Sequence, residues 1–413
     1  MPSIADLYLA FRQAKTALYF ERRGVGLHEL AEYENDLPNK LRELKLATER
    51  QPWFDSLPTG QTWVVPKRFR ESQDQGGDVV RIGTQHDFEA QRPIDIQLRV
   101  SPSPEFAIME VLYLWRFGGA LDALLSQDVL GYRLDVREKQ VVPHRRWLFE
   151  YWPRRYQQFR TAPLNAARDA LARGEHVLVA SGDFASFYDT VAPEFMMSEE
   201  FIVKLEAASG DEFDVDGYKQ ATSSLLRAYD RFRQEGSRRS GTAIDTGVPI
   251  GALTSRLVAN LALAPLDRHI ASIPSVLCYR RYVDDIVIVA RAANTRGGTI
   301  EVLREFLPLR DSPDNVLRLD VEQLGRPGSD FQLQRKKIRV HHLADIPGMD
   351  FVEAVASDFS KAVSERRAFV DSATLAGDGA THLVRAGEAA GSPLRVLRDA
   401  DRARLERYAL STS

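Results

Sequence analysis

The sequence predicts an α+β fold with an antiparallel sheet, and three features of the chain lead to this prediction. Apolar residues recur at helical spacing near the start of the chain, over residues 7–22 and 27–46. Two later segments, 63–70 and 92–100, have the apolar or alternating pattern of strands. In 279–290, two adjacent aspartates separate two apolar runs, which predicts a strand, a tight turn and a second buried strand.

The composition is that of an ordinary globular protein. The 413 residues are 44% hydrophobic and 27% charged, which is enough for two or three domains with cores of their own. The single cysteine, Cys278, excludes an intrachain disulfide and fits a reducing compartment. The first residues lack the features of a signal peptide and no apolar run could cross a bilayer, so we expect a cytoplasmic protein without a membrane partner. Because the net charge is −3, any polyanion must be held by local basic clusters.

Basic residues cluster first on the two predicted strands. They are Lys67, Arg68, Arg92 and Arg99. Paired strands could present these cations to phosphates, or the same residues could form a solvated strand face. The pattern leaves both interpretations open.

A second basic segment follows a buried helix that the apolar spacing predicts over 105–125. Residues 145–160 interleave five arginines with six aromatic residues. This composition suits a surface that grips a nucleic-acid backbone and stacks bases, but the aromatic spacing equally suits the apolar face of one helix. We expect Trp147, Trp152 and Phe159 to pack in the core and the arginines to remain available to nucleic acid.

An acidic residue ends the next predicted strand, which covers 176–182. A carboxylate in this position, Asp183, is a candidate metal ligand, although a turn or helix-capping aspartate is equally common. Asp189 falls where the chain turns into a helix, which favours a capping role. The polar residues of 201–240 fit ordinary surface helices.

A loop rich in glycine and proline, 246–251, then opens a helix that extends to residue 267. Its small residues would let another backbone or a nucleotide approach closely. In the hairpin that follows, Asp284 and Asp285 would repel each other beside a β-rich core; they therefore need a cation, and their hard oxygen ligands suit Mg²⁺. The alternative is an ordinary Asp-Asp turn. The order of acidic strand, loop with helix, and Asp-Asp hairpin favours the metal site, because chance rarely supplies all three in sequence.

Together these segments resemble the reverse transcriptases over roughly residues 60–355. The resemblance is carried by 181–191 (similar to motif A), 247–267 (motif B), 282–285 (motif C), 333–337 (motif D), 348–351 (loosely motif E), and 66–67 with 92–100 (finger motifs). It implies a right-hand polymerase fold with fingers, an antiparallel palm sheet and a short helical thumb. The implied domains are an N-terminal helical extension at 1–60, fingers at 61–175, a palm at 176–355 with a helical insertion near 200–240, and a helical thumb at 356–413 with helices at 359–373, 382–390 and 394–410.

The resemblance also implies roles for individual residues. Asp183, Asp284 and Asp285 match the acidic triad that holds two Mg²⁺ ions, for which Mn²⁺ could substitute, and Phe184 would add its backbone carbonyl. Lys337 matches a catalytic lysine near the leaving pyrophosphate. The residues implied at the nucleotide are Tyr188, which would select deoxynucleotides, and Lys67, Arg68, Arg92, Arg99, Gly247, Pro249 and Gly251. Those implied at primer or template are Tyr282, Ser255, Asn260, Arg154 and Arg155.

The implied partners are an RNA template, a DNA product and dNTPs, with room for a homo-oligomer or an accessory protein. Through 247–251 and 10–15 the chain is most similar to prokaryotic abortive-infection and defence-associated reverse transcriptases, with retron enzymes next. That similarity implies a dedicated non-coding RNA template and a role in antiphage defence. Most members of the family have glutamine at the positions of Thr246 and Ile250. The contacts that the glutamine side chains make near the primer end or the incoming base are therefore absent from this chain. The alternatives are template-independent or protein-primed DNA synthesis at the same site, and a non-catalytic RNA-binding scaffold with a palm fold.

Overall fold

The computed structural model describes residues 2–19, 27–50, 53–69, 94–209, 213–292, 298–310 and 316–368. The chain divides into two compact units, and we describe each by itself. The first unit comprises Met1–Trp152, Ser186–Leu266 and Asp320–Phe331, and the second comprises Pro153–Ala185, Asp267–Leu319 and Gln332–Ser413.

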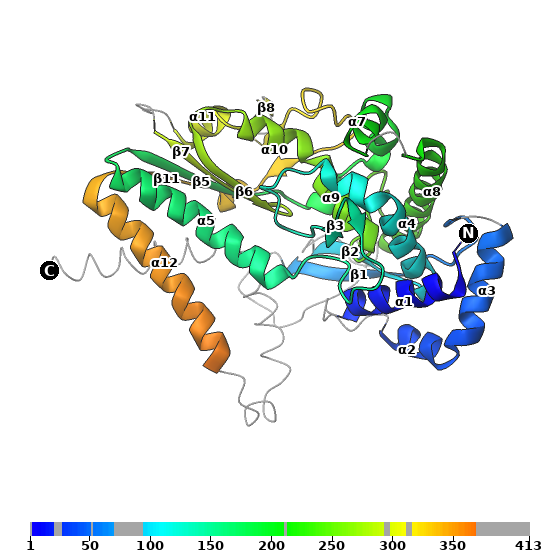
Figure 1. Cartoon of the computed structure of the whole chain (residues 1–413). Coiled ribbons are helices and arrows are strands. Elements are labelled where there is room, and N and C mark those ends of the chain that lie inside the picture. Colours follow the sequence, from blue (N-terminus) through cyan, green and yellow to red (C-terminus); the bar gives the residue numbers. More distant parts are fainter. Residues whose placement is uncertain are drawn as a thin grey trace, which may run out of the picture. The chain divides into compact units, whose positions relative to one another are not determined.

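The first unit contains most of the helices and two small antiparallel sheets (Figure 1). Its helices are α1 (Ile4–Tyr19), α2 (Leu27–Asn35), α3 (Leu37–Arg50), α4 (Pro104–Ala123), α6 (Phe187–Thr190), η1 (Pro193–Met197), α7 (Glu199–Ser209), α8 (Val215–Ser240) and α9 (Leu253–Ala262). Its strand pairs are β1 (Gly60–Phe69) with β2 (Ile94–Pro102), and β3 (Val136–Arg137) with β4 (Gln140–Val141). Helices α1 to α4 and the first strand pair lie close to the ranges that the sequence predicted, whereas the helix predicted to extend to residue 267 ends at Ala262.

Helix α4 lies at the centre of this unit. It begins at a Ser103 N-cap, whose hydroxyl accepts the Phe106 N–H, with proline at the first helical position. Aromatic rings then pack around it: the Phe106 centroid lies 5.0 Å from Phe54 and 5.5 Å from Phe232. Phe232 belongs to α8, which buries one whole face. The prediction of ordinary surface helices over 201–240 is therefore confirmed for α8, whose polar residues lie on the face opposite the buried one.

A buried carboxylate on α4 anchors the start of α9. The Glu110 side chain is fully buried, and its Oε1 accepts hydrogen bonds from the Thr254 N–H (2.8 Å) and Oγ1 (2.5 Å). Its Oε2 is buried with no hydrogen-bond partner. Burial therefore raises the pKa of Glu110 to about 7, against the opposing effect of the Thr254 hydrogen bonds. Since α9 has no side-chain cap of its own at Ala252, Glu110 supplies the missing acceptor.

We expect the stability of this unit to depend on pH through Glu110. The pKa in the folded protein lies above the ordinary 4.5, so this group's stabilisation is complete below about pH 4.5 and is lost as the pH rises through about 7. The expected loss in the free energy of unfolding is ~3 kcal/mol. Denaturant titrations from pH 4.5 to 8 should show wild-type stability falling relative to Glu110→Gln, which cannot ionise. A constant difference between the two proteins across this range would contradict the assignment, and exposed Glu206→Gln serves as control.

The second unit is built on a four-stranded antiparallel sheet in the order β11-β5-β7-β6. These strands are β5 (Val177–Asp183), β6 (Val276–Tyr282), β7 (Asp285–Arg291) and β11 (Arg339–Leu343). The remaining elements are α5 (Trp152–Ala172), α10 (Ala264–Ala271), α11 (Thr299–Arg304), β8 (Leu309–Arg310), β9 (Leu317–Leu319), β10 (Gln332–Leu333), η2 (Arg335–Lys337) and α12 (Asp345–Ala368). Helix α10 begins within the first unit, and α5 begins one residue before the second.

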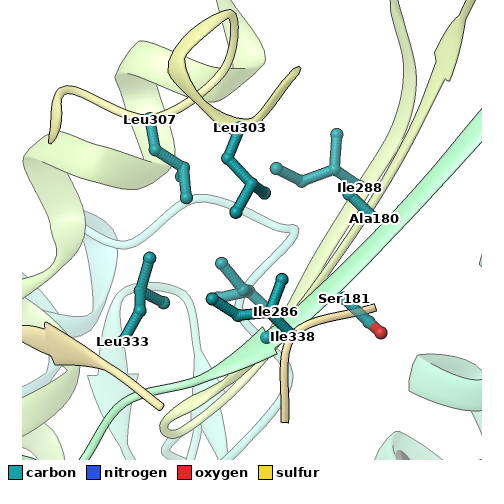
Figure 2. Close-up of a pocket in the computed structure, with 9 residues that line it drawn as sticks. Ala180, Ser181, Ile286, Ile288, Leu303, Leu307, Leu333 and Ile338 are labelled. Atoms are coloured by element: carbon teal, nitrogen blue, oxygen red, sulfur yellow. The ribbon is translucent and has the colours of Figure 1, made fainter. Parts of the chain in front are cut away.

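The two faces of this sheet have different environments because side chains alternate along each strand. One face lies over a small apolar pocket, to which α11 contributes Leu303 (Figure 2). The pocket is lined by Ala180, Gly182, Ile286, Ile288, Leu307, Leu333 and Ile338, with Ser181 at its edge. Figure 2 shows the Ser181 hydroxyl directed away from the apolar side chains. On β5, Ala180 and Gly182 face the pocket, so the alternate residues Ser181 and Asp183 belong to the opposite face of the sheet.

Helices α5 and α12 cover part of that opposite face. The rings of Tyr156 and Phe159 on α5 lie 5.3 and 5.8 Å from the Tyr282 ring on β6. The Phe351 ring on α12 lies 5.0 Å from His341 on β11. The C-terminal helix predicted to begin at Phe359 thus begins at Asp345 and includes the segment compared with motif E. The predicted helices at 382–390 and 394–410 lie outside the described residues.

Candidate active site

The strand register brings two of the predicted aspartates together. On paired strands β5 and β7, Asp183 lies directly opposite Asp285, so both carboxylates are on the same face of the sheet. Their residues are only 4% and 8% exposed. Asp284, half-buried in the hairpin turn, is joined to β5 by its carbonyl, which accepts the Phe184 N–H at 3.2 Å. The backbone therefore fixes three carboxylate-bearing residues at one end of the sheet.

The hairpin turn between β6 and β7 is strained. Only Val283 and Asp284 separate the two strands, and Val283 has a φ of +61°. A β-branched residue rarely adopts a positive φ, which costs on the order of 1–3 kcal/mol. The Arg281 guanidinium donates a hydrogen bond to the Val283 carbonyl at 2.9 Å. Arg281 thereby holds the turn that carries the two aspartates.

Arg281 is itself held by a fully buried ion pair. Its Nε and Nη2 bond the two carboxylate oxygens of Asp267 on α10, both at 2.7 Å, and both side chains are 0% exposed. The Tyr279 hydroxyl donates to the same carboxylate at 2.7 Å. The attraction of Asp267 raises the pKa of Arg281 despite the opposing effect of burial. The guanidinium is therefore charged and fixed when it reaches the turn.

The Asp285 carboxylate is in an environment that suits a cation. Burial raises its pKa well above the usual range, and the nearby charges of Asp284 and Asp183 raise it further. Its Oδ1 is buried with no hydrogen-bond partner. A hard divalent cation would relieve both the repulsion and the missing contact, so these residues fit Mg²⁺. In the described part of the chain, however, no three acidic, histidine or cysteine side chains are already arranged to hold an ion.

Lys337 contacts Asp183 directly. Its Nζ lies 2.6 Å from Asp183 Oδ2, and it is carried by η2, just after β10. The main chain fixes this segment as well, because the Gln334 N–H bonds the Asp183 carbonyl at 3.0 Å and the Ala185 N–H bonds the Gln332 carbonyl at 2.7 Å. The lysine thus neutralises part of the Asp183 carboxylate charge.

Within the first unit, the Gly/Pro loop is bonded to the segment that follows Asp183 in sequence. The Val248 N–H bonds the Tyr188 carbonyl at 2.8 Å, and the Gly247 N–H bonds the Val191 carbonyl at 3.0 Å. Gly247 has a φ of +107°, and a Cβ there would lie 3.0 Å from the Asp189 carbonyl oxygen, so only glycine fits. Asp189 lies inside α6, whose N-cap is Ser186, so the capping role predicted for Asp189 was wrong.

The other end of this loop meets strand β2. A Cβ on Gly251, whose φ is +119°, would lie 2.1 Å from the Val100 carbonyl oxygen. The Val100 N–H bonds the Ile250 carbonyl at 2.8 Å. Pro249 is buried between these contacts. The loop is therefore tied at both ends.

Two residues predicted at primer or template are core residues. Ser255 and Asn260 on α9 are fully buried. The Ser255 hydroxyl bonds the Tyr229 hydroxyl at 3.2 Å, and the Asn260 amide donates to the Gly131 carbonyl at 2.7 Å. Direct contact with nucleic acid, as predicted for both, is thus contradicted by their burial. The resemblance implied contacts with primer or template for these two polar residues, but their side chains instead satisfy buried groups.

The predicted cations of the strand pair are only partly described. Lys67 and Arg68 lie on β1, but their side chains are outside the described part of the structure, as is all of Arg92. Arg99 on β2 is half-buried and donates to Gln97 at 2.8 Å.

In the aromatic and basic segment, residues 145–160, the buried and exposed side chains are not all those that the sequence predicted. Phe159 is buried, as predicted, but Trp152 is 55% exposed and Trp147 half-buried, so core packing was wrong for Trp152. Arg154 is exposed in the first turn of α5, and Arg155 donates to Gln158 at 3.3 Å. The first turn of α5 places its aromatic residue toward solvent because the apolar face of the helix begins only further on.

Sequence reasoning missed Arg281, Asp267 and Glu110. An arginine inside an apolar strand pattern was the available signal for Arg281, since a charge at a strand position flanked by buried residues needs a buried partner. No local pattern marks the partners, which come from other elements.

No curated protein matches the chain. Residues 138–309 match the family model for reverse transcriptase (RNA-dependent DNA polymerase). The matched region contains Asp183, Tyr188, Gly247, Asp284 and Asp285, whereas Lys337 and the strand pair β1–β2 lie outside it. Such a domain uses an RNA template, dNTPs and generally a divalent metal ion to make DNA. No helix in the described ranges has the length and apolarity needed to cross a membrane. Residues 138–309 are therefore similar to a reverse transcriptase domain, which is an RNA-directed DNA polymerase and a nucleotidyltransferase.

Proposed function

We propose that the chain copies RNA into DNA by two-metal phosphoryl transfer at Asp183, Asp284 and Asp285. The observation that carries the proposal is the cross-strand pair of Asp183 and Asp285, two nearly buried carboxylates on one face of the sheet. When bound, divalent ions would activate the primer 3′ hydroxyl and stabilise the leaving pyrophosphate. The Phe184 carbonyl would complete the ligand set.

The roles of the protein's own groups follow from their positions. Arg281 holds the backbone of the turn that carries Asp284 and Asp285, which limits how far that turn must reorganise before the reaction. Lys337 is paired with Asp183 and is the candidate cation for the leaving pyrophosphate. Gly247, Pro249 and Gly251, which form a loop tied at both ends, are candidates for the wall of the nucleotide site.

Tyr188 is the candidate for selecting deoxynucleotides. It is half-buried, and its carbonyl is bonded to Val248. A bulky ring at this position would exclude a ribose 2′ hydroxyl. We therefore expect Tyr188→Ala to use ribonucleotides at least about tenfold better relative to dNTPs, a loss of discrimination of ~1.4 kcal/mol. Tyr188→Phe should keep the wild-type preference. Competitive incorporation of a dNTP and its matching NTP measures both, and unchanged discrimination by Tyr188→Ala would contradict this role.

We further propose a dedicated non-coding RNA as template and antiphage defence as the biological role. Both rest on the similarity of 247–251 and 10–15 to the defence-associated enzymes. Purified protein with a primed RNA template tests the chemistry, and sequencing nucleic acid that co-purifies with wild type and with Asp284→Ala/Asp285→Ala tests the template. Plaque counts of phage on cells that carry either protein test the role. Equal protection by both would favour the non-catalytic scaffold.

A further inference from the structure

An aromatic and basic patch lies on the surface of the first unit, in the residues that lead into α5 and at its first residue. Tyr151 and Trp152 are 60% and 55% exposed, the two most exposed aromatic residues in the described part of the chain. The Trp147 ring lies 6.2 Å from the Tyr151 ring, and the Arg146 guanidinium lies 5.3 Å from the centroid of the Trp147 ring. We call Arg146, Trp147, Tyr151 and Trp152 the Trp147 patch.

The segment that carries the Trp147 patch is firmly anchored. Leu148 and Phe149, in the middle of the segment, are buried. The Gln13 side chain, itself buried on α1, donates to the carbonyls of Val142 and Arg145 at 3.0 and 2.9 Å. The aromatic rings are therefore presented from a fixed base, which lowers the entropic cost of binding a ligand on them.

The charge around the Trp147 patch favours a polyanion. Residues 144–155 contain four arginines and one acidic residue, Glu150, in a chain whose net charge is −3. Arginines bind phosphates, and exposed aromatic rings stack on nucleobases. Bases in a duplex are already stacked and paired, so a stacking surface of this kind suits an unpaired strand.

We propose that the Trp147 patch binds unpaired template RNA, with bases stacked on Tyr151 and Trp152 and the phosphate backbone near Arg146. This proposal rests on the RNA-templated synthesis proposed above. We choose the template because it is single-stranded before it is copied, whereas the product is formed as one strand of a hybrid.

The test measures the affinity of wild type and of three variants for a fluorescent 12-nucleotide RNA without secondary structure. Binding is followed by fluorescence anisotropy in EDTA and without dNTPs. Tyr151→Ala/Trp152→Ala should weaken binding about tenfold or more, since one stacked base accounts for at least about that factor. Tyr151→Phe/Trp152→Phe retains both rings and should bind within about twofold of wild type. Tyr8→Ala, which removes an exposed tyrosine from α1, is the matched control and should bind as wild type does.

Two further arms decide between related outcomes. Binding of an RNA duplex should be unchanged in Tyr151→Ala/Trp152→Ala, and primer extension should show a raised KM for template with unchanged kcat. The proposal is overturned if this variant binds the RNA within about twofold of wild type. If the variant binds RNA normally but has lost affinity for a single-stranded DNA of the same length, the patch belongs to the product and the proposal is overturned as well. Because binding is measured without metal or nucleotide, a wild-type protein that binds RNA through the patch but incorporates no dNTP would refute the proposed function alone.

Discussion

Asp285→Asn should reduce DNA synthesis by at least about 10³-fold, a loss of ~4 kcal/mol of transition-state stabilisation. The amide keeps the shape of the side chain but loses the negative charge that a divalent ion requires. The same variant should unfold at the same or a higher denaturant concentration, because burial and the charges of Asp183 and Asp284 disfavour the ionised carboxylate in the folded protein. Steady-state primer extension and urea titration measure the two effects.

The combination of lost activity and retained stability is what separates a metal ligand from a structural residue. Asp169→Asn, which changes an exposed aspartate on α5 in the same unit, should leave both measurements unchanged. If Asp285→Asn lowered activity only in proportion to a loss of folded protein, the residue would be structural. Retention of most activity by a stable variant would remove Asp285 from the active site.

Arg281→Ala should cost about 3–5 kcal/mol in the free energy of unfolding, because it leaves the fully buried Asp267 carboxylate without its cation. Activity should fall as well, since the Val283 carbonyl in the strained turn loses its donor. Arg291→Ala is the matched control. Arg291 ends the neighbouring strand β7 and pairs with Glu175 at 2.8 Å, but its side chain is 55% exposed, so its loss should cost under about 1 kcal/mol.

A double variant separates the two roles of Arg281. Arg281→Met/Asp267→Leu removes both charges, and a buried ion pair replaced by apolar side chains is often neutral in stability. We expect the double variant to recover most of the stability lost in Arg281→Ala but to keep a lowered kcat, because the turn still lacks its donor. Full recovery of kcat together with stability would show that Arg281 serves folding alone.

The sequence was sufficient for the parts of the site that local patterns encode. The strand ending at Asp183 and the hairpin around Asp284 and Asp285 follow from apolar runs interrupted by carboxylates, and the antiparallel register then places Asp183 opposite Asp285. Lys337, which the resemblance to motif D implied near the leaving pyrophosphate, contacts Asp183, and its role in the reaction stays a prediction.

What could not be predicted depends on partners far apart in the chain. Glu110 is separated from Thr254 by 144 positions, and nothing near either residue indicates that one caps the helix of the other. Trp152 was placed in the core because the aromatic spacing of 145–160 suits the apolar face of one helix, and only the packing of α5 shows that Trp152 faces solvent. Ser255 and Asn260 were assigned to nucleic acid through the resemblance of their segment to motif B, which does not show that both side chains are buried.

Binding of Mn²⁺, followed by electron paramagnetic resonance of the free ion, tests the central claim most directly. Mn²⁺ takes the same oxygen ligands as Mg²⁺ and can be detected without catalysis. We predict that wild-type protein binds Mn²⁺ in the presence of dNTP, and that Asp183→Asn and Asp285→Asn each weaken this binding by at least about tenfold, a loss of ~1.4 kcal/mol, while Asp169→Asn does not. Equal Mn²⁺ affinity in all four proteins would contradict a metal site at the paired ends of β5 and β7.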